Sequence, residues 1–383
     1  MTPSMAIKSL KALGVYNIII TSGTLSPLES FEGEMGIPFP IKLQSTHVIS
    51  KNQLSIQPIF NDSNGIELSG AFSNRGNVKY YYGLGSTIYE LSKNIPKGIF
   101  IFFSSYTAIN TCMEHWKNCH LWNFITGEKQ VFIEPRSKNE FNASLNDFKE
   151  AVDKRSGAIF MGVSRGKLSE GMDLGDDYCR AVIIIGLPYP AAYDPKVVLK
   201  KKYMDDFNPK INGNSWYMLQ MKRALNQSVG RVVRHKDDYG AIIICDSRFK
   251  NLSDGLSRWI QAFNTNMNAK INEGFGAKMT SIANFYKQHG TGALVQRPIR
   301  NEGVPPPPSI GMKPCASMAQ GPAGKSNDVE VQSAFDLMKS SYKTNRPSNG
   351  VSPSAAAPKS SGDSKSIFNS LNYPTGKKRN FEP

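Results

Sequence analysis

The feature that most constrains the fold is an alternation of short apolar runs with helical patterns, which extends over residues 1–296. Most of these runs are continuous and rich in Ile, Val and Phe, which is typical of strands buried on both faces of a parallel sheet. The predicted strands span residues 15–20, 53–59, 98–103, 131–133, 158–163, 181–186 and 241–245.

Helical patterns separate the runs and predict helices at residues 81–92, 105–118, 141–152 and 214–229. Ser144 and Asn214 are the predicted N-terminal caps. Strand–helix alternation over this length predicts an α/β sandwich in which the loops at the strand ends are available for chemistry.

Composition changes sharply near residue 297. Twelve of the chain's 23 prolines lie beyond this point, and apolar periodicity is lost. We therefore expect one ordered domain at 1–296 and a disordered, basic, Pro- and Ser-rich tail at 297–383. The tail carries +6 of the net charge of +15, which leaves +9 for residues 1–296. Two basic parts favour a polyanionic partner, with nucleic acid first and an anionic membrane surface second.

Membrane and metal-dependent classes are disfavoured by what the sequence lacks. No apolar run approaches the roughly 20 residues of a spanning helix, and the first 25 residues lack the pattern of a signal peptide. The five cysteines are odd in number and show no CxxC or Cys/His ligand spacing, so neither a disulfide framework nor a zinc site is favoured. We expect no membrane partner, no bound metal and a cytosolic or nuclear location.

The most informative motif is QSVGRVVR at residues 227–234, just before the predicted strand 241–245. On a helix, Arg231 and Arg234 would emerge on one face with Gln227 one turn earlier, an arrangement that suits a triphosphate. Gly230 inside a helix indicates close approach by another backbone or by a ligand. The alternative is a solvated basic helix end.

A second motif, SRGKLSEGMD at residues 164–173, directly follows the predicted strand 158–163. Arg165, Lys167 and Glu170 accompany two glycines there, a combination typical of the ligand-binding end of an α/β sheet. Gly166 and Gly171 would free backbone amides to face phosphates, and Glu170 or Asp173 could orient water, ribose or a partner arginine. The alternative is an ordinary turn with solvated charges.

Two hydroxyl-rich segments also follow predicted strands. TSGTLSP at 21–27 contains Ser22 and Thr24, and FFSSY at 102–106 contains Ser105 and Tyr106. Hydroxyls at a strand end can contact a phosphate backbone, and an aromatic ring can stack on a base. The same hydroxyls are commonly helix caps.

The sequence shows no phosphate loop of its own in a suitable context. AQGPAGKS at 319–326 fits a relaxed pattern, but a working loop follows a buried strand and opens a helix, whereas this segment lies in the Pro-rich tail. No strict GxxxxGK[ST] occurs, and no apolar strand ends in an Asp-Glu pair. The chain therefore has no visible site that would cradle ATP and magnesium unaided.

Taken in order, the four motifs resemble the second motor domain of the iron–sulfur-type superfamily 2 DNA helicases. Residues 21–27 resemble motif III of that family, 102–106 motif IV, 164–173 motif V and 227–234 motif VI. Further segments at 34–53, 186–205 and 235–249 most resemble the branch that regulates telomere elongation. The resemblance implies a single RecA-like parallel-sheet sandwich, a nuclear location, and ATP-dependent 5′→3′ unwinding of DNA in repair, recombination control and telomere maintenance.

The resemblance also implies roles for individual residues. Arg234 would be an arginine finger on the γ-phosphate, supported by Arg231 and Gln227, while Glu170, Gly171, Asp173 and Gly230 would line the nucleotide cleft. Single-stranded DNA would be contacted by the remaining motif residues, Ser22, Thr24, Ser105, Tyr106, Arg165 and Lys167. ATP with Mg²⁺ would sit between this domain and a first motor domain, and the tail could dock DNA-replication or repair proteins.

The family's first motor domain carries the phosphate loop, the Asp-Glu-Ala-His box and the cysteines of the iron–sulfur cluster, and none of these is in this sequence. We therefore expect the isolated chain not to hydrolyse ATP. The alternative is a non-catalytic nucleic-acid-binding adaptor that kept the helicase fold. A glycosyl- or nucleotidyl-transferase is a third reading, supported only by the strand–helix alternation.

Overall fold

The computed structural model describes residues 3–22, 25, 28–45, 47–154, 157–169, 174–208, 211–252, 256–263 and 267–290. It divides the chain into two units, residues 1–316 and 317–383, and the second lies wholly outside the described residues. The predicted tail at 297–383 is likewise outside them. Among the described residues, no helix combines the length and apolar character needed to cross a membrane.

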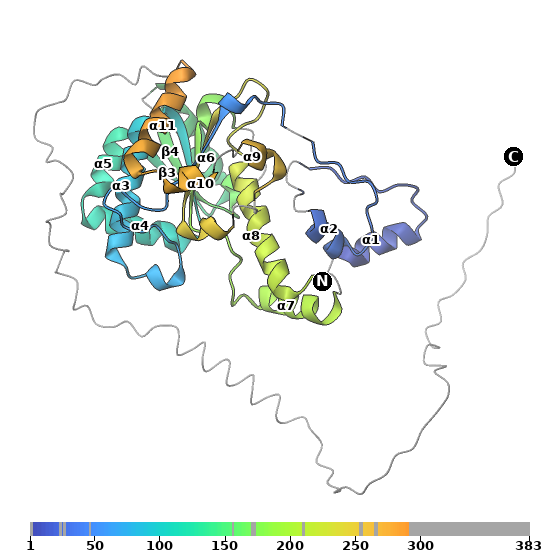
Figure 1. Ribbon diagram of the computed structural model, residues 1–383. Coiled ribbons are helices and arrows are strands. Elements are labelled where there is room, and N and C mark those ends of the chain that lie inside the picture. Colours follow the sequence, from blue (N-terminus) through green and yellow to red (C-terminus); the bar gives the residue numbers. More distant parts are fainter. Residues whose placement is uncertain are drawn as a thin grey trace, which may run out of the picture. The chain divides into compact units, whose positions relative to one another are not determined.

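A six-stranded, all-parallel sheet forms the centre of the first unit (Figure 1). Its strand order is β1-β6-β5-β2-β4-β3. The strands are β1 (Leu54–Pro58), β2 (Lys97–Phe103), β3 (Gln130–Ile133), β4 (Gly157–Val163), β5 (Ala181–Ile185) and β6 (Gly240–Cys245). Six of the seven predicted strands are therefore confirmed, and so is the predicted fold class, a RecA-like parallel-sheet sandwich.

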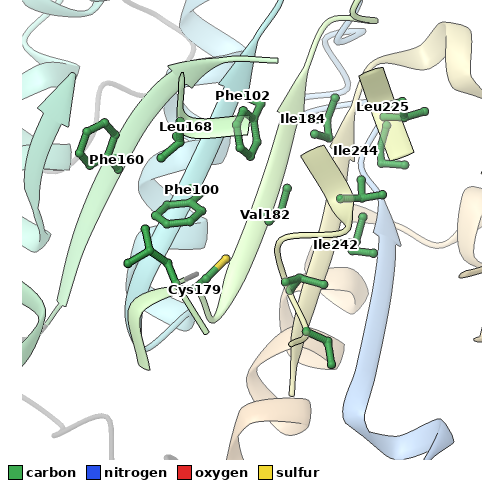
Figure 2. Close-up of a cluster of buried hydrophobic side chains, with 14 of the residues drawn as sticks. Phe100, Phe102, Phe160, Leu168, Cys179, Val182, Ile184, Leu225, Ile242 and Ile244 are labelled. Atoms are coloured by element: carbon green, nitrogen blue, oxygen red, sulfur yellow. The ribbon is translucent and has the colours of Figure 1, made fainter. Parts of the chain in front are cut away.

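Both faces of this sheet are covered, because successive strand residues alternate between two apolar clusters. Phe100 and Phe102 of β2 point to one face, where Phe160, Val182 and Ile244 join them (Figure 2). Helices α6 (Lys138–Lys154), α8 (Gly213–Val229) and α9 (Arg258–Phe263) pack on that face.

The opposite face carries Ile99, Ile101 and Phe103 of β2. It is covered by α3 (Val78–Asn94), α4 (Tyr106–Asn118), α5 (Leu121–Glu128) and α11 (Phe275–Gln288), which gather on one side in Figure 1. The remaining elements are α1 (Pro3–Ala12), α2 (Leu28–Met35), α7 (Pro195–Phe207), α10 (Met267–Asn272) and the short 3₁₀ turns η1 (Lys51–Gln53), η2 (Phe72–Asn74), η3 (Lys167–Ser169), η4 (Asp176–Tyr178) and η5 (Ser247–Asn251).

The two predicted helix caps are wrong. Helix α6 already begins at Lys138, so Ser144 lies inside it, and α8 begins at Gly213, so Asn214 is its second residue. Asn212 caps α8 instead, because its side chain accepts a 2.8 Å hydrogen bond from the amide of Ser215. Ser144 lies well after the first residue of α6, and Asn214 lies two residues after the actual cap of α8. Apolar periodicity does not fix the exact ends of a helix.

The predicted strand at residues 15–20 is also wrong. These residues have no strand structure, and the side chains of Tyr16 and Ile19 are 98% and 85% exposed. An apolar run becomes a strand only where another strand offers backbone donors and acceptors. None of the described strands pairs with residues 15–20.

The strand order creates one functional edge. Strand β2 lies in the middle, with β4 and β3 on one side and β5, β6 and β1 on the other. Ligands of open parallel sheets bind beyond the carboxyl ends of the strands near such a reversal. We call this the carboxyl edge and define it by residues 69–75, 104–106, 134–136, 164–169, 186–190 and 246–248.

Candidate functional site

The segment after α8 carries the two predicted triphosphate-binding arginines. Helix α8 ends at Val229 with Gly230 as its C-cap, so Arg231 and Arg234 lie in non-helical backbone. The expectation that they share one helical face is therefore wrong. Gly230 has φ −66°, and a Cβ there would meet only the carbonyl oxygens of the preceding helical turn, with Asn226 O at 3.0 Å. Its role among the described residues is to end the helix.

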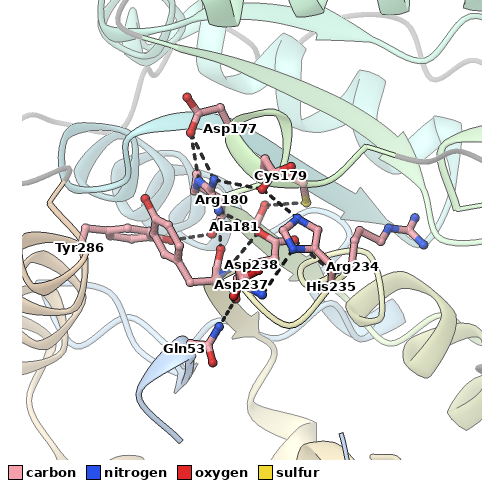
Figure 3. Close-up of polar contacts among 12 residues, drawn as sticks. Gln53, Asp177, Cys179, Arg180, Ala181, Arg234, His235, Asp237, Asp238 and Tyr286 are labelled. Atoms are coloured by element: carbon pink, nitrogen blue, oxygen red, sulfur yellow. Dashed lines mark hydrogen bonds and ion pairs between the residues drawn. The ribbon is translucent and has the colours of Figure 1, made fainter. Parts of the chain in front are cut away.

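A buried carboxylate organises this segment, residues 230–239, which we call the arginine loop. Asp238 has no exposed surface, and its Oδ2 accepts a 2.9 Å hydrogen bond from the amide of Arg234. Its Oδ1 accepts bonds of 2.9 Å from Arg180 Nη1 and from the amide of Tyr239 (Figure 3). A buried carboxylate with these partners fixes the backbone around Arg234.

The side chains of Arg180 and Gln53 attach the arginine loop to the sheet. Arg180, which precedes β5, also donates to Asp177 Oδ1 over 3.2 Å and lies 4.0 Å from the centre of the Tyr239 ring. Gln53, which precedes β1, donates to the carbonyls of Lys236 and Asp238 over 2.7 and 2.8 Å. The side chain of Arg234 extends away from this network (Figure 3).

The structure brings the arginine loop to the segment predicted to be motif V. Arg231 Nη2 donates a 2.5 Å hydrogen bond to the carbonyl of Ser169. On the far side of residues 170–173, Gly175 lies so close to Arg234 that an added Cβ would be 3.0 Å from its Cγ. Glu170, Gly171 and Asp173 lie outside the described residues. Gln227 is half-buried in the last turn of α8.

Asp176, His235 and Asp238 have ligand atoms within 4.8 Å of one another, a spacing that would suit a metal ion. Arg180 lies among them, because its Nη1 is 2.9 Å from Asp238 Oδ1 and its Nη2 is 4.0 Å from Asp176 Oδ1. A guanidinium in this position already neutralises the carboxylates. We therefore interpret the cluster as an ion-pair network that supports the arginine loop.

Four of the residues predicted to contact DNA lie at the carboxyl edge. Ser105 caps α4 by accepting a 3.1 Å hydrogen bond from the amide of Ala108. Tyr106 donates its hydroxyl to Glu134 Oε1 over 3.0 Å. Burial, together with the Glu134 carboxylate, raises the pKa of Tyr106 to about 12. The phenol is therefore neutral and remains a hydrogen-bond donor at physiological pH.

The two cations of the loop after β4 contact backbone carbonyls. Arg165 is exposed, and its Nη2 donates to the carbonyl of Gln220 over 2.7 Å. Lys167 Nζ donates to the carbonyl of Pro135 over 3.0 Å and to that of Arg136. Both charges thus lie at the carboxyl edge, with part of their donor capacity already used.

Glu134 is a buried residue at this edge that the sequence did not reveal. It follows β3, is 2% exposed, and accepts hydrogen bonds from the amides of Val163 (2.9 Å) and Lys167 (2.6 Å) as well as from Tyr106. Gly166 leaves room for it, because an added Cβ would be 2.4 Å from Oε1. Glu134 therefore joins the motif IV and motif V segments. The only signal in the sequence is an acid directly after an apolar run.

Ser22 is not brought together with these residues. Thr24 lies outside the described residues, and Ser22 is exposed. Ser22 lines a cleft of about 940 Å³ between residues 11–45 and residues 257–259. None of the four carboxyl-edge residues above belongs to the lining of that cleft.

The structure thus combines a RecA-like parallel sheet with an arginine loop after α8 and hydroxyls at the end of β2. Residues 88–263 match the family of helicase C-terminal domains. The match includes the predicted motifs IV, V and VI and excludes residues 21–27.

The relatives narrow the class further. The chain is 42% identical over 303 residues to a regulator of telomere elongation helicase 1 homolog of Anopheles gambiae, covering 77% of this chain and 30% of that protein. The homolog of Drosophila persimilis is 38% identical over 310 residues, covering 79% and 30%. The predicted resemblance to iron–sulfur-type superfamily 2 helicases of this branch is thereby confirmed. The chain spans about a third of the length of these relatives.

Solved structures are also similar. An XPD helicase is 18% identical with a TM-score of 0.49, and the match covers 69% of this chain and 44% of that one. A second, Xpd4 of S. tokodaii, is 20% identical with a TM-score of 0.44, covering 65% of this chain and 45% of that one.

Proposed function

We propose that this chain is the C-terminal motor domain of an ATP-dependent 5′→3′ DNA helicase that acts in the nucleus in DNA repair, recombination control and telomere maintenance. The observation that carries the proposal is the arginine loop. Its backbone is fixed by Asp238, Arg180 and Gln53, while the Arg234 side chain extends out of that network (Figure 3). A cation presented on a fixed backbone suits charge stabilisation at a transferring phosphoryl group.

On this proposal, Arg234 is the arginine finger that reaches the γ-phosphate of ATP, with Arg231 and Gln227 in support. Glu170, Gly171, Asp173 and Gly230 line the same cleft. ATP and Mg²⁺ are shared with a first motor domain, which supplies the phosphate loop and the ligands of an iron–sulfur cluster. Comparable fingers contribute about 10³–10⁵ in rate. This chain alone does not hydrolyse ATP.

The carboxyl edge is the proposed track for single-stranded DNA. Ser105, Tyr106, Arg165 and Lys167 lie there together, and Glu134 joins two of the segments that carry them. Hydroxyls, amides and cations at strand ends position a phosphate backbone without reading its sequence. The nucleotide and DNA groups are connected through residues 164–169, because Ser169 accepts the hydrogen bond from Arg231.

The test uses Arg234→Ala in a longer helicase that contains this domain and a first motor domain. We expect DNA-stimulated ATP hydrolysis to fall by about a thousandfold or more, with single-stranded DNA affinity nearly unchanged. Lys236→Ala is the matched control, because Lys236 is exposed on the same loop. An equal loss of DNA affinity would place Arg234 on the DNA side. Unchanged ATP hydrolysis would favour the alternative, a non-catalytic nucleic-acid-binding adaptor with the helicase fold.

A further inference from the structure

A loop outside all four predicted motifs also reaches the carboxyl edge. Residues 69–75 follow β1, and Gly70 lies against the end of β5, where an added Cβ would be 2.8 Å from the Cα of Gly186. Gly186 in turn lies next to Ser104 at the end of β2, with an added Cβ at 3.7 Å from its Oγ. Loop 69–75 is therefore adjacent to the segment that carries Ser105 and Tyr106.

This loop presents an aromatic ring and a cation together. The side chain of Phe72 is 77% exposed, and the guanidinium of Arg75 lies 4.5 Å from the centre of its ring. Hydrogen bonds fix the backbone beneath them: Gly70 N donates to Asp246 Oδ2 over 3.2 Å, and Asn74 Nδ2 donates to Ser69 O over 2.9 Å. A single exposed apolar residue is ordinary, but an exposed ring paired with an arginine is a stacking platform for bases.

A second arginine is held beside this platform. Asp246 follows β6 and has no exposed surface, and its two oxygens accept Arg248 Nε over 2.9 Å and Nη2 over 2.6 Å. The same Oδ2 accepts the amide of Gly70, so Arg248 and loop 69–75 share one anchor. The Arg248 side chain is 33% exposed, and none of the described residues accepts a hydrogen bond from its Nη1. A guanidinium oriented by a buried carboxylate retains a donor for a phosphate oxygen.

We propose that loop 69–75 and Arg248 form an additional subsite for single-stranded DNA, in which a base stacks on Phe72 and the adjoining phosphates contact Arg248 and Arg75. The proposal rests on the proposed function, because it extends the DNA track at the carboxyl edge across the ends of β5 and β6. Stacking on an aromatic ring is independent of base identity, so the subsite binds DNA without sequence preference.

The test is a fluorescence-anisotropy titration of the full chain with labelled oligothymidylate at low salt. Phe72→Leu removes the ring, and we expect binding to weaken by about fivefold or more. Phe207→Leu is the matched control, since Phe207 is 70% exposed at the end of α7 and should leave affinity unchanged. In Phe72→Trp, affinity should persist and the added tryptophan fluorescence should be quenched by the oligonucleotide.

A salt series separates stacking from charge. Arg248→Gln should reduce the slope of log affinity against log salt by about 0.7, the value of one phosphate contact on single-stranded DNA, whereas Phe72→Leu should leave the slope unchanged. Thermal melting checks that Arg248→Gln is folded. If Arg248→Gln does not fold, the affinity of Phe72→Leu decides the result, because Phe72 is exposed and its replacement does not disturb the core. Wild-type affinity in Phe72→Leu overturns the subsite alone. A wild-type chain without affinity for DNA overturns the proposed function as well.

Discussion

At the scale of single residues, Glu134 joins two segments of the carboxyl edge although it is not one of the predicted contact residues. Its two oxygens accept three hydrogen bonds from two separate segments. Unpaired buried amides are costly, whereas exposed cations such as Arg165 can be lost at little cost to the fold. A residue that contacts no ligand can therefore determine whether the ligand site exists.

We predict that Glu134→Ala destabilises the fold by about 3 kcal/mol, because the amides of Val163 and Lys167 lose their acceptor at about 1–3 kcal/mol each. Urea unfolding measures the change. Glu140→Gln is the control, since Glu140 is exposed in the first turn of α6. Equal stability of Glu134→Ala and wild type would show that these amides find other acceptors. Single-stranded DNA affinity should fall with Glu134→Ala even at temperatures where it remains folded.

Tyr106 provides a prediction on pH. Its pKa is raised from 10.0 to about 12 in the folded chain, so the folded state favours the neutral phenol. The resulting stabilisation is complete below pH 10 and is lost as the pH rises through the folded-state value. Melting temperatures across this range should therefore fall less steeply in Tyr106→Phe than in wild type. Parallel curves would show that the Tyr106 hydroxyl is not in this environment.

Arg231 and Arg234 could be predicted from the sequence, but the side chains that position their loop could not. Their types and spacing are visible in the chain, whereas Arg180 lies 58 residues before Asp238 and meets it only through the parallel pairing of β5 with β6. Gln53 is 185 residues from Asp238. Such partners follow from the strand order, and the order of strands in a sheet is not encoded in apolar runs.

At the scale of elements, the sheet edge at β1 is closed by two lysines. Lys270 donates its Nζ to the carbonyl of Ile56 over 3.1 Å, and Lys278 donates to that of Pro58 over 2.6 Å. Burial lowers the pKa of both amines. An edge strand presents unpaired backbone groups that invite pairing with other chains, and charged side chains are a common protection. Here α10 and α11 deliver that protection to β1.

We predict that Lys278→Met destabilises the chain by about 1–3 kcal/mol, the cost of leaving a buried carbonyl without a donor. The exposed fraction of Lys278 is 4%, so water does not replace the amine. Chemical denaturation is the measurement, with Lys287→Met on the exposed face of the same helix as the control. A stability equal to wild type would show that the bond to Pro58 contributes nothing net.

Strands could be predicted where a continuous apolar run corresponds to a strand buried on both faces of the sheet. Strands β4, β5 and β6 are apolar and buried throughout, as is β2 after Lys97, and the pattern of apolar runs recovers them. Residues 15–20 carry the same signal, yet they have no strand partner among the described residues. Helix α7 was missed although Asp194 caps it and Pro195 is its first residue, because only Met204 is buried and its apolar face is weak.

At the scale of the whole molecule, the charge of +9 on residues 1–296 should produce salt-sensitive binding of single-stranded DNA. For three phosphate contacts, we expect affinity to fall about twentyfold between roughly 50 and 200 mM salt. Filter binding measures it, and ATP hydrolysis measured on the same preparation should stay at background. Affinity that does not respond to salt would point away from phosphate contacts, and hydrolysis above background would contradict the proposed division of the ATP site.

The contacts of α11 show that the folded unit is larger than the region that matches the helicase family. The helicase match begins at Ile88, inside α3, and ends at Phe263. Outside it lie β1, the start of α3, and α11, whose Ile282 and Tyr286 are 0% and 1% exposed and whose Tyr286 hydroxyl donates to the carbonyl of Arg180 over 2.6 Å. A fragment trimmed to 88–263 would leave β6 as a bare edge and uncover one face of the sheet. The residues that match the helicase family are thus fewer than the residues that the fold requires, because flanking segments complete the sheet and cover its face.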